Sequence, residues 1–290
     1  MTRLARPKFL TTLLLALFLQ PISAAQANKP AVGITPPVQA PQIQSPATNY
    51  RFDNGTIYFY RAEYRLWNAG IASLRLERDP SGEQRVLAAA DATGFVARLF
   101  GVHDRFEAAV DPKTFCSLHL SKHIEEGFRK RDARIHMDYR RKKSVYDEVN
   151  LKSGEKKHYE NDMPSCVTDV ISGLFYLSSL PLQLDNTYSF PLNDGGATVL
   201  VHAKVEAHEQ IKTDAGIFNT VRVKPESPVG LLKSKSKGVW IWYSDDSQHI
   251  PVQMRGKMTW GTLTFSLQRI EHAQQMNVVS NQASQQTNRQ

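Results

Sequence analysis

Residues 197–207 have the sequence ATVLVHAKVEA, in which two kinds of side chain alternate along the chain. The odd positions carry only alanine and valine, whereas the even positions carry mainly polar residues. Successive side chains of a β-strand point to opposite faces of a sheet. This stretch therefore predicts a strand with one face in a core and the other face in solvent.

The same alternation recurs along most of the chain, and turn-forming residues separate the runs. We expect roughly eleven strands, at residues 57–67, 70–78, 84–92, 104–111, 114–122, 131–140, 197–207, 216–224, 238–244, 250–260 and 262–268. Gly, Asn, Asp and Pro fill the short gaps between many of them, and connections this short join antiparallel strands. The predicted fold class is mainly β: a curved antiparallel sheet or half-barrel meander.

One segment, at about residues 165–180, departs from this period. Ser165 is positioned to cap a helix, and Val167, Val170, Ile171 and Leu174 follow at helical spacing before Pro181. A shorter helical turn is also expected near residues 95–100. The amphipathic helix at 165–180 must bury its apolar face, so we expect it to lie on the sheet or to fill its open side.

The N-terminus has the pattern of a secretory signal peptide. Arg3, Arg6 and Lys8 precede an apolar run at residues 9–19, and Ala25 and Ala27 supply the small residues of a cleavage site. We expect residues 1–27 to be a signal peptide and the protein to be periplasmic or secreted. The apolar run is shorter than the roughly 20 residues that span a bilayer, so the mature protein is not expected to be transmembrane.

Composition divides the rest of the chain. Residues 28–50 are rich in proline and predict a linker, residues 51–272 form the single β-rich domain, and residues 273–290 predict a disordered polar tail.

The predicted mature chain is mildly basic. Removing residues 1–27 takes away three basic side chains, which leaves 33 Lys and Arg against 28 Asp and Glu, or +5. These charges are spread along the chain, so we expect no nucleic-acid partner. Basic stretches, chiefly residues 129–143, are expected to be solvated edge strands, or alternatively a surface for anionic lipid or an acidic partner.

The chain has two cysteines, Cys116 and Cys166. An even number in an exported protein favours one disulfide, which would fasten the predicted helix to the sheet. The alternative is two buried thiols.

No catalytic or metal-binding motif stands out in the sequence. Two S-x-x-K matches, at Ser153 and Ser234, lie in Lys-rich turns that would not desolvate the lysine. His119 and His123 lie on one expected strand, too far apart to share a metal ion. His103 and Asp104 are neighbours on another strand and should point to opposite faces. We therefore expect a non-enzymatic protein without a cofactor or metal site.

Four passages stand out: YRLWNAG at residues 64–70, DVISGLFYL at 169–177, GIFNTVRV at 216–223, and VWIWYSDD at 239–246 followed by Ile250-Pro251-Val252. In this order they resemble an exported bacterial family known as domain of unknown function number 3108. The resemblance implies a sheet-rich periplasmic protein, similar in shape to the half-barrels of lipoprotein and lipid carriers. It implies no particular activity.

The functional hypothesis is an apolar concavity that binds a lipid or another hydrophobic ligand. Eleven strands offer more apolar surface than one helix can cover, so the sheet must curl or a ligand must cover the remainder. The expected lining residues are Val199, Val201, Val205, Phe218, Val221, Val223, Leu174 and Phe175. One alternative is an envelope interaction or assembly module without a small ligand, which would bind an envelope protein, and another is a hydrolase with a non-standard site. A fully curled barrel filled by side chains is also compatible with the pattern.

Overall fold

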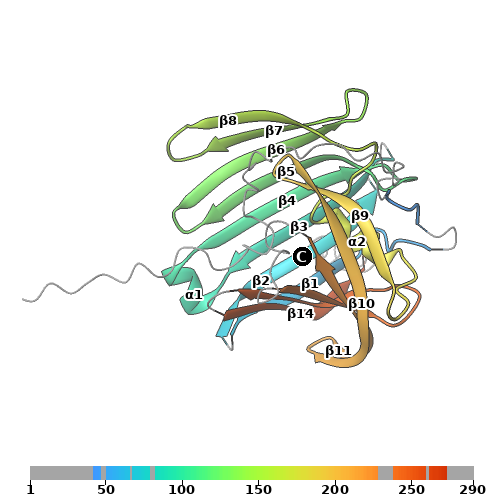
Figure 1. Ribbon diagram of the computed structural model, residues 1–290. Coiled ribbons are helices and arrows are strands. Elements are labelled where there is room, and N and C mark those ends of the chain that lie inside the picture. Colours follow the sequence, from blue (N-terminus) through green and yellow to red (C-terminus); the bar gives the residue numbers. More distant parts are fainter. Residues whose placement is uncertain are drawn as a thin grey trace, which may run out of the picture.

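The computed structural model describes residues 42–46, 50–65, 67–78, 82–227, 238–258 and 261–272. The predicted signal peptide, most of the predicted linker and the predicted C-terminal tail lie outside these residues. Inside them the chain forms one antiparallel sheet that curves around a short helix (Figure 1). None of the described helices is long and apolar enough to cross a membrane.

Fourteen strands and two helices follow one another along the chain. They are β1 (Ile57–Tyr64), β2 (Trp67–Arg78), β3 (Gln84–Ala92), α1 (Gly94–Leu99), β4 (Val102–Val110), β5 (Ser117–Glu126), β6 (Arg129–Asp138), β7 (Lys143–Asn150), β8 (Lys156–Asp162), α2 (Ser172–Ser178), β9 (Thr187–Asp194), β10 (Ala197–Thr213), β11 (Gly216–Glu226), β12 (Gly238–Ser244), β13 (Pro251–Met258) and β14 (Gly261–Glu271).

Nearly every strand pairs with its neighbour in sequence, as in a meander. The spatial order runs β8-β7-β6-β5-β4-β3-β2-β1-β14-β13-β12-β11-β10-β9, so the first strand pairs with the last and the two free edges are β8 and β9. Strands β1 to β8 form a broad wall, and β9 to β11 cross in front of it (Figure 1). The predicted curved antiparallel half-barrel is confirmed.

The strand count exceeds the expected eleven by three, because β7, β8 and β9 were not anticipated. Their sequences are KSVYDEVN, KKHYEND and TYSFPLND. Strand β7 turns Ser144, Tyr146 and Glu148 toward the interior, so it lacks an apolar face with a period of two. A pattern search that requires apolar residues on one face misses such strands.

The internal helix is shorter than predicted: α2 begins at Ser172 and not at Ser165. Cys166 is held in a disulfide, and Thr168 forms an isolated bridge with Leu192 of β9, so the preceding segment is extended. The N-cap position of α2 is Ile171, and the carboxylate of Asp169, two residues earlier, caps the first turn: its Oδ1 accepts hydrogen bonds from the backbone N–H groups of Ile171 and Ser172 at 3.0 and 2.9 Å. All seven residues of α2 are buried, so the helix lies in the core inside the curved sheet.

The two sheet edges meet through side chains and not through a backbone ladder. The turn between β9 and β10 rests on β7 and β8, where Tyr159 Oη donates to Gly195 O at 2.9 Å and Asn161 Nδ2 donates to Gly196 O at 3.1 Å. Gly196 has φ of +78°, and a Cβ atom there would lie 2.7 Å from the Cβ atom of Tyr146. The turn can approach the wall this closely because the residue has no side chain.

Candidate functional site

The eight residues predicted to line an apolar concavity lie in or against one hydrophobic core. Six of them are buried, and Val199 and Phe218 are partly buried against the same cluster. They come from β10, β11 and α2, and all eight belong to this cluster or pack against it. Their role in ligand binding remains a prediction.

An apolar cavity of about 60 Å³ lies between the wall and α2. Of the eight predicted residues only Leu174 contributes to it. The other lining residues are Tyr60, Ala72, Ser73, Leu74, Ala88, Ala89, Ala90, Phe106, Ile171, Met254 and Phe265. Alanine side chains of β2 and β3 form its floor, and they leave open the space that larger apolar residues would fill. Ala72 and Ala88 remain partly exposed, so the floor reaches solvent.

In two cross-strand rows the buried face of the wall changes from apolar to charged, whereas the row of Val86, Ala108, Leu120, Ile135 and Tyr146 stays apolar from β3 to β7. In one cross-strand row Leu74, Ala88 and Phe106 on β2 to β4 are followed by Lys122, Ala133, Glu148 and Lys157 on β5 to β8. The next row reads Ala72, Ala90, Asp104, Ile124 and Arg131. We call the concave face of β1 to β4 the apolar half and that of β5 to β8 the charged half. Asp104 stands at their boundary.

Ion pairs organise the charged half. Glu148 accepts hydrogen bonds from Arg131 Nη1 at 2.7 Å, Lys157 Nζ at 2.9 Å and Tyr146 Oη at 2.6 Å. Burial raises the pKa of Glu148, but these donors outweigh it and hold the pKa below its usual value. Lys122 forms an ion pair with Asp194 of β9 and so ties the wall to the opposite edge. The buried charges of Glu148 and Lys122 are thus matched by partners on neighbouring strands and on β9 respectively.

Asp104 lacks a comparable set of partners. Its side chain is fully buried, and Oδ1 accepts one hydrogen bond from the Glu125 backbone N–H at 2.9 Å. Oδ2 is buried without a hydrogen-bond partner. Burial, reinforced by the neighbouring Glu126 carboxylate, raises the pKa of Asp104 to about 8. Asp104 is therefore mainly protonated at neutral pH.

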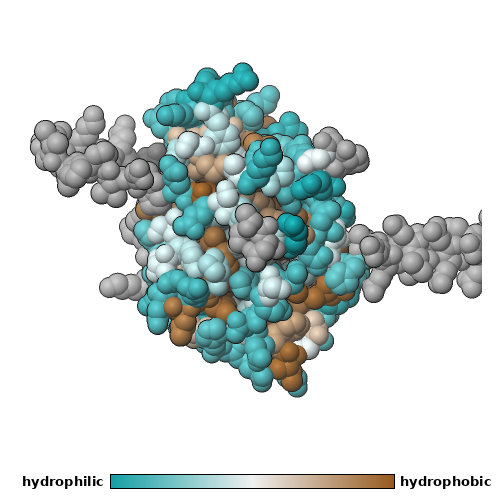
Figure 2. Space-filling view, turned by 90° about the vertical axis from the view of Figure 1, so that its right-hand side faces the viewer, coloured by the Kyte–Doolittle hydropathy of each residue, from teal (hydrophilic) through white to brown (hydrophobic). Residues whose placement is uncertain are grey.

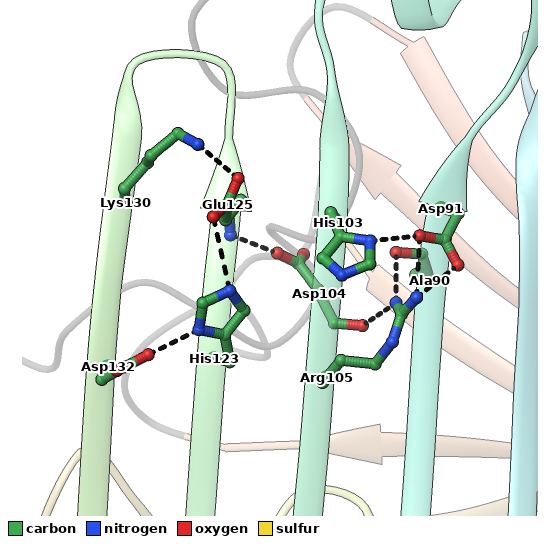
Figure 3. A network of polar contacts seen from close by, with 9 residues as sticks. All are labelled: Ala90, Asp91, His103, Asp104, Arg105, His123, Glu125, Lys130 and Asp132. Carbon is green, nitrogen blue, oxygen red and sulfur yellow. Dashed lines mark hydrogen bonds and ion pairs between the residues drawn. The ribbon is translucent and has the colours of Figure 1, made fainter. Parts of the chain in front are cut away.

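The convex face holds a different set of polar contacts (Figure 3). His103 Nδ1 lies 2.7 Å from Asp91 Oδ1, and His123 Nδ1 lies 2.6 Å from Asp132 Oδ1. As expected, His103 and Asp104 point to opposite faces of β4. Among the residues that the structure describes, no group of three His, Cys, Asp or Glu side chains is arranged to hold a metal ion.

The predicted disulfide between Cys116 and Cys166 is confirmed, with 5.2 Å between the Cα atoms. Further contacts fasten α2: Tyr243 Oη donates to Leu174 O at 3.0 Å, and His249 Nδ1 lies 2.9 Å from Ser178 O. Tyr50 of the predicted linker donates to Ser178 Oγ at 3.0 Å. Helix α2 is therefore anchored at several points and acts as a fixed inner wall of the cavity.

A family model matches residues 59–268 of this sequence, which is most of the chain. That model describes a protein of unknown function, DUF3108. The chain belongs to the DUF3108 family. No functionally curated protein matches the sequence of this DUF3108 chain.

Solved structures extend the likeness at the level of fold. A β-barrel-like protein of domain of unknown function DUF1849 from Brucella abortus is 8% identical with a TM-score of 0.54, and the match covers 77% of the DUF3108 chain and 99% of the other. A candidate exported protein with a YmcC-like fold from Bacteroides fragilis is 10% identical over 77% and 99% of the two chains, with a TM-score of 0.35. The first likeness shows a shared fold, and the second is too distant to carry an argument.

The charged half of this DUF3108 chain was not anticipated. Its residues lie on β5 to β8, and two of those strands were missed because their inward positions are polar. The available signal is the abundance of charged residues along these strands, but the sequence analysis considers only the basic stretch at residues 129–143 and predicts solvated edge strands, or a surface for anionic lipid or an acidic partner. The alanines of the cavity floor were expected to lie on strands but were not singled out as a binding surface.

Proposed function

We propose that this protein is an exported, non-catalytic binding protein that holds an apolar molecule against the apolar half of its concave face. The observation that carries the proposal is the alanine-floored cavity beside α2. Ligand sites are typically concave and mainly apolar, with a few polar groups nearby. Here Asp104 supplies a polar group next to Ala90 and Phe106 of the lining.

The size of the cavity limits the ligand. Sites for drug-sized molecules enclose roughly 300–1,000 Å³, whereas this cavity encloses about 60 Å³. It therefore suits the end of an alkyl or acyl chain, with the rest of the ligand lying over Ala72 and Ala88. Each Å² of apolar surface buried would contribute about 25 cal/mol to binding.

Two features support export. The N-terminal residues have the order of charge, apolar run and small residues that signal peptidases recognise. Both cysteines of the chain are joined in a disulfide, and such bonds persist mainly in oxidising compartments outside the cytoplasm.

Titration with an environment-sensitive fluorescent acyl probe tests the binding proposal. We expect saturable binding to the wild-type protein and a loss of at least roughly tenfold in affinity in Ala88→Phe, about 1.4 kcal/mol, because the phenyl ring would occupy the cavity. Leu87→Phe is the matched control, since Leu87 lies on the convex face of the same strand. Equal affinity in Ala88→Phe and the wild type, or no saturable binding to the wild type, would contradict the proposal.

A further inference from the structure

The two ends of the wall differ in their exposed side chains. In an antiparallel meander alternate connections lie at the same end, so the β1–β2, β3–β4, β5–β6 and β7–β8 connections share one end. Figure 1 shows this end at the left, with α1 on it. We call it the α1 end. The opposite end carries the β2–β3, β4–β5 and β6–β7 connections and the segment from β8 to β9.

Exposed hydrophobic side chains gather at the α1 end. Eight large hydrophobic residues are exposed in the part of the chain that the structure describes, and five of them belong to this end: Trp67, Phe95, Leu99, Phe128 and Leu151. Trp67, Phe95 and Phe128 are 72%, 70% and 78% exposed. The opposite end has Leu184 alone among these eight residues. Single exposed hydrophobic residues are ordinary, but five on successive connections of one end form a pattern.

Charge follows the same division. Among the residues that the structure describes, positions 65, 67, 93–101, 126–130 and 150–157 of the α1 end contain seven Lys and Arg residues against two Glu. The described segments 82–83, 111–116, 139–142 and 163–186 of the opposite end contain four basic against four acidic residues, of which Asp169 is fully buried. The opposite end, which faces the viewer in Figure 2, is mainly hydrophilic, with hydrophobic residues gathered in its lower part.

Cations and aromatic rings are interleaved at the α1 end. Lys152 of the β7–β8 turn lies over the ring of Phe128 in the β5–β6 turn, with its Nζ 5.3 Å from the ring centroid. Arg98, Lys152 and Lys156 form no ion pair with any residue that the structure describes. Arg129 lies near Glu126, and Lys130 forms an ion pair with Glu125.

We propose that the α1 end docks peripherally on an anionic lipid membrane, with Trp67, Phe95 and Phe128 in the interface and the surrounding cations at the headgroups. The amphipathic indole ring of tryptophan favours the interfacial region of a bilayer, and apolar phenylalanine side chains insert at the boundary between headgroups and acyl chains. Clustered Lys and Arg are attracted to anionic lipids. A membrane fits this end better than a second copy of the chain, because two such ends would bring like charges together. The inference does not rest on the proposed ligand site.

Cosedimentation with vesicles of phosphatidylethanolamine and phosphatidylglycerol tests the docking surface. The triple variant Trp67→Ser/Phe95→Ser/Phe128→Ser should bind at least about tenfold more weakly than the wild type. The matched control, Leu184→Ser/Ile217→Ser, removes two exposed hydrophobic side chains elsewhere and should bind like the wild type. All proteins carry the same N-terminus, so any contribution from residues 1–27 cancels. Circular dichroism confirms that each variant is folded.

The electrostatic contribution to vesicle binding is tested separately, by its dependence on salt and on lysine side chains. Wild-type binding should weaken when salt rises from about 0.1 to about 1 M, because the Debye length falls from about 10 to about 3 Å. Lys152→Gln/Lys156→Gln should weaken binding to these vesicles but not to vesicles of phosphatidylcholine alone. The proposal is overturned if the wild type does not bind vesicles or if the triple variant binds equally well. It is also overturned if the triple substitution converts a dimer into a monomer, because that result would assign the surface to a second copy.

Discussion

The two halves of the concave face bury their residues by different means. The apolar half meets α2 with alanine, leucine and phenylalanine and leaves a small cavity. The charged half is covered at Lys122 by the turn between β9 and β10, through an ion pair and hydrogen bonds. The apolar half can therefore accept more apolar surface, whereas the charged half depends on specific partners that are costly to remove.

Removing a charge from the charged half should have the largest effect on stability. Glu148→Ala would leave Arg131 and Lys157 without their shared carboxylate, and breaking a buried pair typically costs about 3–5 kcal/mol. Urea denaturation measures this loss. Glu107→Ala is the control, because Glu107 pairs with Arg85 on the exposed convex face and should cost at most about 1 kcal/mol. Similar losses in the two variants would remove the distinction between these surfaces.

The disulfide should stabilise chiefly helix α2, which covers the apolar half. Replacing Cys116 and Cys166 together by alanine should lower the free energy of unfolding by about 2–4 kcal/mol, because the bond closes a loop of 50 residues. Hydrogen exchange should show the greatest loss of protection in residues 172–178, next to the broken anchor. A uniform loss across the sheet would show that the bond does not act through the helix.

The boundary residue Asp104 should make stability depend on pH. Its pKa in the folded protein is about 8, against 3.8 ordinarily, so between these values the folded state keeps a proton that the unfolded state has lost. The folded state therefore loses stability as pH rises through this window, by up to about 1.4 kcal/mol per pH unit. Asp104→Asn should lose less stability than the wild type between pH 5 and pH 8, measured by urea denaturation. Parallel pH profiles would contradict the assignment.

The smallest expected effect on stability comes from enlarging either of two alanines in one cross-strand row. Ala88 borders the cavity, whereas Ala133 lies packed between Lys122 and Glu148. Ala133→Leu should cost about 1–3 kcal/mol by overpacking. Ala88→Leu should change the free energy of unfolding by less than about 1 kcal/mol, because the added carbons enter existing space. Thermal denaturation of the two variants checks the order, and equal losses would show that the cavity cannot accept added atoms.

The sequence was informative where the interior is apolar. The alternation at 197–207 predicted β10, and the two cysteines predicted the link between the sheet and the α2 segment. It was uninformative where polar residues face inward, as in β7 and β8, because Glu148 and Lys157 resemble surface residues until their partners are known. The start of α2 was also misplaced, since Ser165 and Asp169 are both good capping residues and tertiary contacts select Asp169.

The candidate site, too, could be predicted only in part from the sequence. The eight predicted residues are apolar and lie in or against one core cluster, but of these only Leu174 borders the cavity. The cavity floor depends on cross-strand pairing, which brings Ala72 beside Ala90 and Leu74 beside Ala88. Register between strands is set by the whole sheet, so no local pattern in β2 or β3 could have indicated the space beside α2.

The most direct test of the account is a paramagnetic measurement of where an apolar chain binds. An acyl chain with a nitroxide near its terminal methyl group would be titrated into isotope-labelled protein while the backbone amide signals are recorded. The account predicts selective broadening of β2, β3, β4 and α2, centred on Ala88, with the signals of β7 and β8 unaffected. Broadening centred on the charged half, or no selective broadening at saturating probe, would contradict the claim that the apolar half is the binding surface.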